Sequence, residues 1–226
     1  IGLQGYTGNT IMKQGHADAT DLPNFEYLNP NNLEGSDFIL PNKQLSAFAQ
    51  GIVSLSTNLS LTPGLRCEFI DTRANGWYRE YIIDGAGNIL EDSIFTSNKE
   101  FQRHVILPGI GFSYNAKNNL EVYGNAVVNF RAVNFSDIQI RNLGVVIDPN
   151  INDEKGSNID LGARSNSGIL KWDFSIFMLN YNDKIGLYPT TIPHPILIEK
   201  PVLLRTNIAN ARTFGLEGLL QATLIE

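Results

Sequence analysis

The chain has 226 residues, with 17 lysine and arginine residues against 23 aspartate and glutamate residues and a formal net charge of −6. This acidic balance argues against nonspecific nucleic-acid binding, which requires basic surfaces. The single cysteine, Cys67, excludes an internal disulfide, and no apolar run reaches the roughly 18 residues of a membrane-spanning helix. No signal-peptide pattern follows Ile1, so a signal for export would lie upstream, and we interpret the chain as an internal segment.

Alternating apolar and polar residues predict about eight β-strands. In chain order, these strands cover residues 1–5, 44–53, 59–71, 104–114, 120–131, 158–164, 171–179 and 213–224. The alternation is clearest in the third strand, where Leu65 and Phe69 lie on one side and Arg66 on the other. The strongest segments run about 10 residues or more, as a tilted membrane strand requires, whereas strands of globular proteins average about 5–6.

The links between these strands alternate strictly in length. Short turns are predicted at residues 54–58, 115–119 and 165–168, and long connections at 6–42, 72–103, 132–156 and 182–204. The second long connection contains a hairpin of its own, which turns at residues 84–88. Bacterial outer-membrane barrels have short periplasmic turns and longer extracellular loops. We therefore predict an all-β fold, an antiparallel up-and-down meander of about eight long strands that is part of a transmembrane β-barrel.

In such a barrel, the polar sides of the strands face the lumen. The charged residues on these sides are Arg66, Arg131, Arg164, Arg205, Glu68, Glu121, Asp160 and Glu217. Two interpretations stay open: the charges neutralise one another, or the arginines capture the carboxylates of a citrate-like or siderophore ligand. Under the second interpretation, the ligand-binding residues facing the lumen or the cell exterior are Arg66, Glu68, Arg131, Arg205 and Asn207.

The sequence gives little support for catalysis or for a protein-built metal site. His16, His104 and His194 are scattered without ligand spacing. No Ser-His-Asp, Cys-His or paired-carboxylate constellation stands out, so we do not expect an enzyme. We also expect the chain itself to bind no cofactor; iron, if involved, would arrive as a chelate.

Several short motifs follow one another along the chain. They are Ala47-Phe48-Ala49-Gln50, Leu61-Thr62-Pro63-Gly64-Leu65-Arg66, Leu107-Pro108-Gly109-Ile110-Gly111-Phe112-Ser113-Tyr114, Phe130-Arg131 with Phe135-Ser136-Asp137, Ser157-Asn158-Ile159-Asp160-Leu161-Gly162-Ala163-Arg164 after residues 149–155, and Ala211-Arg212-Thr213-Phe214-Gly215-Leu216-Glu217 within residues 207–217. In this order, and over nearly the whole chain, they resemble the barrel of TonB-dependent outer-membrane receptors, closest to the ferric-citrate-type receptors of Bacteroidetes-like bacteria.

The resemblance implies that residues 1–226 form a single internal segment of a plugged barrel of about 22 strands, without the plug domain and the remaining strands. Such receptors take up ferric citrate or another ferric siderophore across the Gram-negative outer membrane. Lipid surrounds the barrel, the long loops are extracellular, and the TonB complex acts through the plug. The chain departs from the family pattern because it has no energy-coupling box and no terminal aromatic residue, and because Asp153 stands where a proline is usual. Such a segment would not transport by itself.

Two other architectures stay open. A self-closed barrel of eight strands would need strands that begin and end at the chain termini, and residues 1–5 are short for that role. A soluble β-sandwich that binds glycans would use the aromatic side chains of Trp77, Tyr78 and Tyr81. In a sandwich, the apolar sides of residues 59–69 and 214–224 would face each other across a dry interior. An open sheet has two unpaired edges, so a segment that stands alone would pair with copies of itself or be the ordered part of a longer chain.

Overall fold

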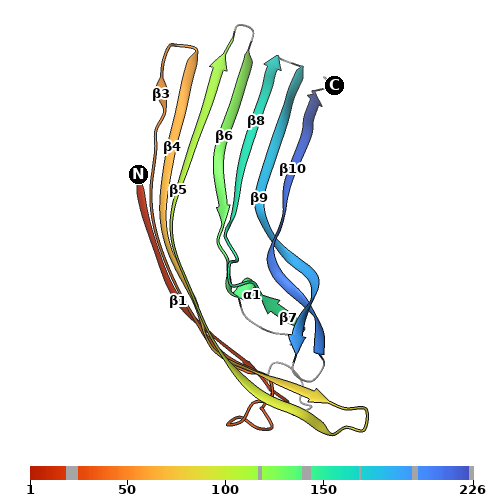
Figure 1. Cartoon of the computed structure of the whole chain (residues 1–226). Coiled ribbons are helices and arrows are strands. Elements are labelled where there is room, and N and C mark those ends of the chain that lie inside the picture. Colours follow the sequence, from red (N-terminus) through yellow and green to blue (C-terminus); the bar gives the residue numbers. More distant parts are fainter. Residues whose placement is uncertain (19–24, 117–118, 139–143, 168, 195–197, 224–226) are drawn as a thin grey trace.

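The computed structural model describes residues 1–18, 25–116, 119–138, 144–167, 169–194 and 198–223. The described chain consists almost entirely of β-strands (Figure 1). The elements in chain order are β1 (Gly2–Gln14), β2 (Ser36–Gln50), β3 (Val53–Ser54), β4 (Leu59–Ile83), β5 (Ile89–Asn115), β6 (Leu120–Arg131), α1 (Phe135–Ile138), β7 (Val145–Ile147), β8 (Glu154–Ser167), β9 (Leu170–His194) and β10 (Ile198–Ala222).

The long strands form one curved sheet in the order β1-β2-β4-β5-β6-β8-β9-β10 (Figure 1). Each of them runs antiparallel to its neighbours. The short strand β3 pairs with β4, and β7 pairs with the outer edge of β10 in parallel over Leu203–Arg205. The predicted all-β meander of about eight long strands is therefore confirmed.

The sheet is open at both edges within the described part of the chain. Strands β1 and β10 lie toward opposite ends of the strand order and do not pair with each other. A self-closed barrel would need that pairing, and a sandwich would need a second sheet packed on the first. Neither architecture fits the described residues, so both alternatives are set aside for this chain.

The long connections differ most from the sequence prediction. Long connections were expected at residues 6–42, 72–103 and 182–204, the second with a hairpin of its own. Strands occupy much of each: β1 extends to Gln14, the predicted hairpin is the outer part of the longer hairpin formed by β4 and β5, and β9 and β10 form another. The predicted turn at residues 84–88 is confirmed between β4 and β5. These outer parts of the strands lack one consistently apolar side, so the period of two that marks a half-buried strand is missing from their sequence.

The remaining connections are closer to the prediction. The turns at residues 54–58 and 115–119 join consecutive strands, although residues 117–118 lie outside the described chain. Strand β8 continues to Ser167, so the third short turn is tighter than predicted, and its residue 168 also lies outside the described chain. The long connection at residues 132–156 contains α1 and β7, neither of which was predicted.

The two faces of the sheet differ in chemistry. Residues paired across neighbouring strands point to the same face, and the register places the leucine-bearing sides of β4 and β10 on the convex face. Large apolar side chains exposed on this face include Leu45, Leu65, Ile106, Ile110, Val128, Ile159, Leu161, Phe174, Ile176, Phe214, Leu216 and Leu220. The apolar sides of β4 and β10 therefore point out of one sheet instead of facing each other across an interior.

The apolar band on the convex face has a definite height. On β4 it runs from Leu59 to Phe69 and ends at the charged residues Asp71 and Arg73. Ten residue steps at about 3.3 Å each span roughly 33 Å along the strand. With a strand tilt of about 40°, this corresponds to a height of roughly 25 Å, the height of the apolar belt on outer-membrane barrels.

The concave face carries the paired charges of the sheet with some apolar side chains among them, and one connection folds onto it. Residues 132–138 and 144–153, here called the inner segment, include α1 and β7. The segment covers Phe38 and Leu40 of β2 and Ala74 of β4 with its own apolar side chains. The resulting buried cluster comprises Phe38, Leu40, Ala74, Val133, Ile138, Ile147 and Ile151. Burial of this apolar surface holds the inner segment against the inside of the sheet.

Candidate functional site

Two of the predicted arginines meet on one carboxylate of the inner segment. Arg131, at the end of β6, donates to Asp137 Oδ2 at 2.8 Å and to Glu154 Oε1 at 2.7 Å. Arg205 of β10 donates to Asp137 Oδ1 at 3.2 Å. The backbone N–H of Asn134 also donates to Asp137 Oδ2, which fixes this carboxylate at the start of α1. We call these four ionic residues, Arg131, Asp137, Glu154 and Arg205, the Asp137 cluster.

Arg66 and Glu68 form a second ionic pair on the concave face. They are two residues apart on β4, so they share a face, and the Arg66 guanidinium donates to the Glu68 carboxylate. Neighbouring side chains of β2 complete the pair: Arg66 Nη2 donates to Ser46 Oγ at 3.1 Å, and Gln44 Nε2 donates to Glu68 Oε2 at 3.2 Å. The guanidinium also lies 5.9 Å from the centre of the Phe48 ring.

An open pocket of about 330 Å³ lies between these two ionic groups. Its walls come from β2, β4 and the chain from the end of β6 into the inner segment, and they include Asn42, Thr72, Glu68 and Arg131. The side-chain oxygen of Asn42 is buried and has no hydrogen-bond partner among the described residues. The structure thus brings Glu68 and Arg131 to one pocket that also offers an uncommitted acceptor.

The amide of Asn207 is used for backbone contacts. Its Oδ1 accepts the N–H of Asn152 at 2.8 Å, and its Nδ2 donates to the carbonyl groups of Asn152 and Asp183. The register between β9 and β10 shifts directly after Asn207. Asn207 therefore ties the irregular part of this strand pair to the inner segment, and its side chain does not line the pocket.

Sequence reasoning missed a buried arginine beside the pocket. Arg103 of β5 donates to Asp153 Oδ1 at 2.6 Å, to Thr72 Oγ1 at 3.2 Å and to the carbonyl of Val133 at 3.1 Å. Arg103 is the last residue of the connection predicted at residues 72–103. It lay outside the alternating strands, so the sequence did not indicate which face of the sheet its side chain would occupy. Its partner Asp153 was visible in the sequence as a departure from the family pattern, because it stands where a proline is usual. The carboxylate of Asp153 holds the end of the inner segment against the sheet.

The predicted lumen arginines all have carboxylate partners on the concave face. Near the short turns, Arg164 Nε donates to Glu121 Oε2 at 2.8 Å, and the hydroxyl of Tyr123 donates to Asp173 at 2.6 Å. This pairing matches the interpretation in which the lumen charges neutralise one another. Open guanidinium surface remains even so: the side chains of Arg66 and Arg131 are 36% and 40% exposed.

The described residues contain no group of three or more histidine, cysteine or acidic side chains arranged to hold a metal ion. Within the same residues, no helix has the length and apolar character needed to cross a bilayer.

Residues 2–224 match the family model described as TonB dependent receptor-like, beta-barrel. Similar structures include the ferric-catecholate import receptor Fiu from K12 E. coli, with a TM-score of 0.64, 12% identity, and coverage of 99% of this chain and 32% of Fiu. The ferric yersiniabactin uptake receptor FyuA from Yersinia pestis gives a TM-score of 0.62 and 16% identity over 96% of this chain and 29% of FyuA.

A third similar structure is the ferric citrate transporter FecA in the unliganded form, with a TM-score of 0.55 and 19% identity over 87% of this chain and 26% of FecA. These identities are low, so the likeness concerns the fold. The chain spans less than a third of the length of each of these three receptors. The family match over nearly every residue shows that this chain belongs to the TonB-dependent receptor-like β-barrel family.

Proposed function

We propose that the chain is part of an outer-membrane receptor for active uptake of a chelated nutrient, with ferric citrate or another ferric siderophore as the favoured ligand. The observation that carries the proposal is the contrast between the two faces of one sheet. The convex face is an apolar band of bilayer height, and the concave face carries paired charges around a pocket. The names of Fiu, FyuA and FecA point to ferric ligands for this class of receptor.

In this proposal, the long hairpins face the cell exterior and the short turns face the periplasm. The band on β4 ends near Phe69, whereas the strand continues to Ile83. The hairpin formed by β4 and β5 therefore projects by about a dozen residues per strand beyond the hydrocarbon, as extracellular loops of outer-membrane barrels do. Lipid contacts the convex face, and the TonB complex acts through a plug domain that these residues do not include.

The ligand is recognised on the concave face by Arg66, Glu68, Arg131 and Arg205, with Asn207 fixing the backbone beside them. Arginine presents a planar fork of donors that matches carboxylates and the oxygen atoms of a chelate. The carboxylate partners hold each guanidinium in place, and the exposed edge of Arg131 borders the pocket. Iron enters as part of the chelate and is cargo, so the chain needs no metal ligands of its own.

The test is binding and uptake of ⁵⁵Fe-labelled citrate by the full-length receptor in cells that lack other iron receptors. Arg131→Gln should weaken binding by about tenfold or more, because it removes a charge-assisted contact to the ligand. Arg164→Gln is the matched control, since Arg164 lies on the same concave face and bonds Glu121 near the short turns, outside the Asp137 cluster. A receptor that neither binds nor imports ferric citrate, ferric catecholates or ferric hydroxamates would contradict the proposal.

A further inference from the structure

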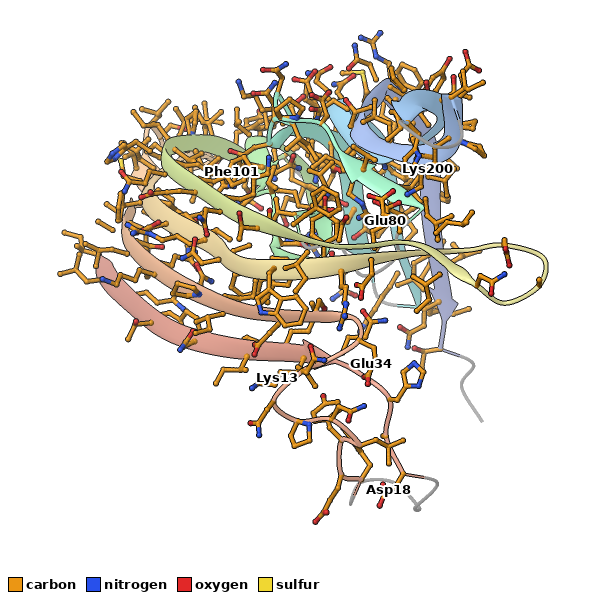
Figure 2. The ribbon with its side chains drawn as sticks, turned by 60° about the horizontal axis from the view of Figure 1, so that its bottom comes forward. Lys13, Asp18, Glu34, Glu80, Phe101 and Lys200 are labelled. Carbon is orange, nitrogen blue, oxygen red and sulfur yellow. The ribbon has the colours of Figure 1, made fainter. Side chains whose placement is uncertain are left out.

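The two long hairpins meet although their strands are not neighbours in the sheet. Strands β6 and β8 separate the β4–β5 pair from the β9–β10 pair. Near the hairpin ends, Lys200 of β10 forms an ion pair with Glu80 of β4 (Figure 2). The imidazole Nε2 of His194 on β9 lies 3.6 Å from Glu91 Oε2 on β5. The hairpins thus bridge the concave side of the sheet.

The register explains why these four side chains converge. Glu80 pairs with Ser93 and Ile82 pairs with Glu91, so both glutamates lie on one face of the β4–β5 hairpin. On the other hairpin, Lys200 pairs with Ile192, two residues from His194, which places the lysine and the histidine on one face. Each hairpin therefore presents two titratable side chains to the other.

These contacts are more sheltered from solvent than an ordinary surface ion pair. The exposed fractions of the side chains are 13% for Glu80, 15% for Lys200, 17% for Glu91 and 8% for His194. Exposed pairs contribute little because water screens them, whereas removing one partner of a sheltered pair leaves a desolvated charge without compensation. A single neutral substitution should therefore separate the hairpins.

We infer that Glu80, Glu91, His194 and Lys200 form a clasp between the two hairpins, which narrows the outer entrance to the space in front of the concave face, here called the chamber. The ends of the two hairpins lie beyond α1 and β7 when viewed from the short turns (Figure 1). The clasp thus limits how large molecules reach the inner segment and the pocket from outside. This gating role rests on the proposed extracellular placement of the hairpins.

The clasp is tested by labelling a cysteine on the inner segment in the full-length receptor in intact cells. Ser136 of α1 is exposed, so Ser136→Cys, with Cys67→Ala and any other cysteines replaced, reports access to the chamber. The probe is a membrane-impermeant maleimide carrying a polyethylene glycol chain. Lys200→Gln and Glu80→Gln should each raise the labelling rate by about fivefold or more, because either change leaves one sheltered charge unpaired.

The double substitution Glu80→Lys with Lys200→Glu restores the opposite charges and should return the labelling rate to within about twofold of the parent. The matched control is Glu199→Gln, because Glu199 is exposed and adjoins Lys200 in sequence; it should leave the rate unchanged. Equal labelling in Lys200→Gln and the parent, or no recovery in the double variant, would overturn the clasp. Heat-modifiable migration in gels verifies that each variant has folded.

A second reporter separates failure of the clasp from failure of the proposed orientation. Asn88→Cys lies at the exposed turn of the β4–β5 hairpin. Its rate of reaction with the same probe should not change with the clasp substitutions. If Asn88→Cys does not react in intact cells, the extracellular placement is wrong. The labelling of Ser136→Cys is then compared on receptor purified in detergent, where the probe reaches both ends of the barrel. The same ratios of labelling rate between the variants and the parent then test the clasp.

Discussion

Arg103 and Asp153 lie 50 residues apart in the chain, and Arg103 Nε donates a hydrogen bond to Asp153 Oδ1 at 2.6 Å. The same carboxylate oxygen accepts the backbone N–H of Val133 at 2.7 Å. One acidic side chain thus joins the start of the inner segment, its end and the middle of β5. The inner segment is therefore fastened to the sheet at both ends by polar contacts and in between by its apolar cluster.

Asp153→Ala should release the inner segment from the sheet. The substitution leaves the Arg103 guanidinium, which is buried, without its ionic partner, at a cost of about 3–5 kcal/mol. Limited proteolysis of the full-length receptor should show new cleavage near residues 133–153, and urea unfolding in lipid vesicles should show the lower stability. Asp160→Asn is the control, since Asp160 is also on the concave side of β8 but outside the Arg103 contacts. Equal cleavage of the two variants would contradict this role of Asp153.

Gly76 is the position on β4 where the chain has no room for a side chain. A Cβ atom there would lie 2.1 Å from the carbonyl oxygen of Asp37 and 2.7 Å from the Cα of Phe38. Because these atoms belong to the backbone of β2, Gly76→Ala should push β2 and β4 apart and cost about 1–3 kcal/mol. Urea unfolding in vesicles measures the loss. Gly85→Ala is the control, because a Cβ atom at Gly85 meets nothing within 4 Å; similar stability of both variants would show that the close approach is unimportant.

Alternation predicted the strands well only where the two faces of the sheet differ. Residues 59–69 and 213–222 belong to the apolar band, so the alternation placed their apolar side chains on the convex face, with Leu219 as an exception on the concave face. Phe38 and Leu40 break the rule: they are apolar and yet lie on the concave face, because the inner segment covers them. No local pattern reveals such a cover, since it comes from a segment about 100 residues later in the chain.

The candidate site could be predicted only in part, because alternation along a strand covers its strand residues and not those of the connections. Arg66 and Arg131 lie within alternating strands, so their concave placement followed from the period of two. Asp137 lies in a connection with no period, and it contacts Arg205 across 68 residues of sequence. Spacing along a strand gives the face of a residue, whereas the identity of its partner depends on how the connections fold.

Glu34 should keep its charge to unusually low pH. Its carboxylate lies in the connection between β1 and β2 (Figure 2). It accepts the backbone N–H of His16 at 2.9 Å and the side-chain N–H of Asn29 at 2.6 Å. These hydrogen bonds lower the pKa of Glu34 from 4.5 to about 2. A lowered pKa in the folded state stabilises the folded connection above pH 4.5, and this stabilisation is lost as the pH falls toward 2.

The carbon-13 signal of the Glu34 carboxyl in isotope-labelled receptor checks this titration. The signal should change with a midpoint near pH 2, and Asn29→Ala should move the midpoint upward, because it removes one donor to the carboxylate. A midpoint that is the same in both proteins would show that the Asn29 contact does not stabilise the ionised form.

Leu65→Arg should destabilise the receptor in a membrane, because Leu65 lies near the middle of the apolar band on the convex face of β4. An arginine at the bilayer midplane of a barrel costs about 2–4 kcal/mol, and the cost falls to about 0–1 kcal/mol near the interface. Asn75→Arg is the matched control: Asn75 is exposed on the same strand and the same side, beyond the charged residues Asp71 and Arg73 that end the band. Urea unfolding of the full-length receptor in lipid vesicles gives both values. Equal stability of the two variants would mean that water, and not hydrocarbon, surrounds the convex face, and the receptor interpretation would lose its physical basis.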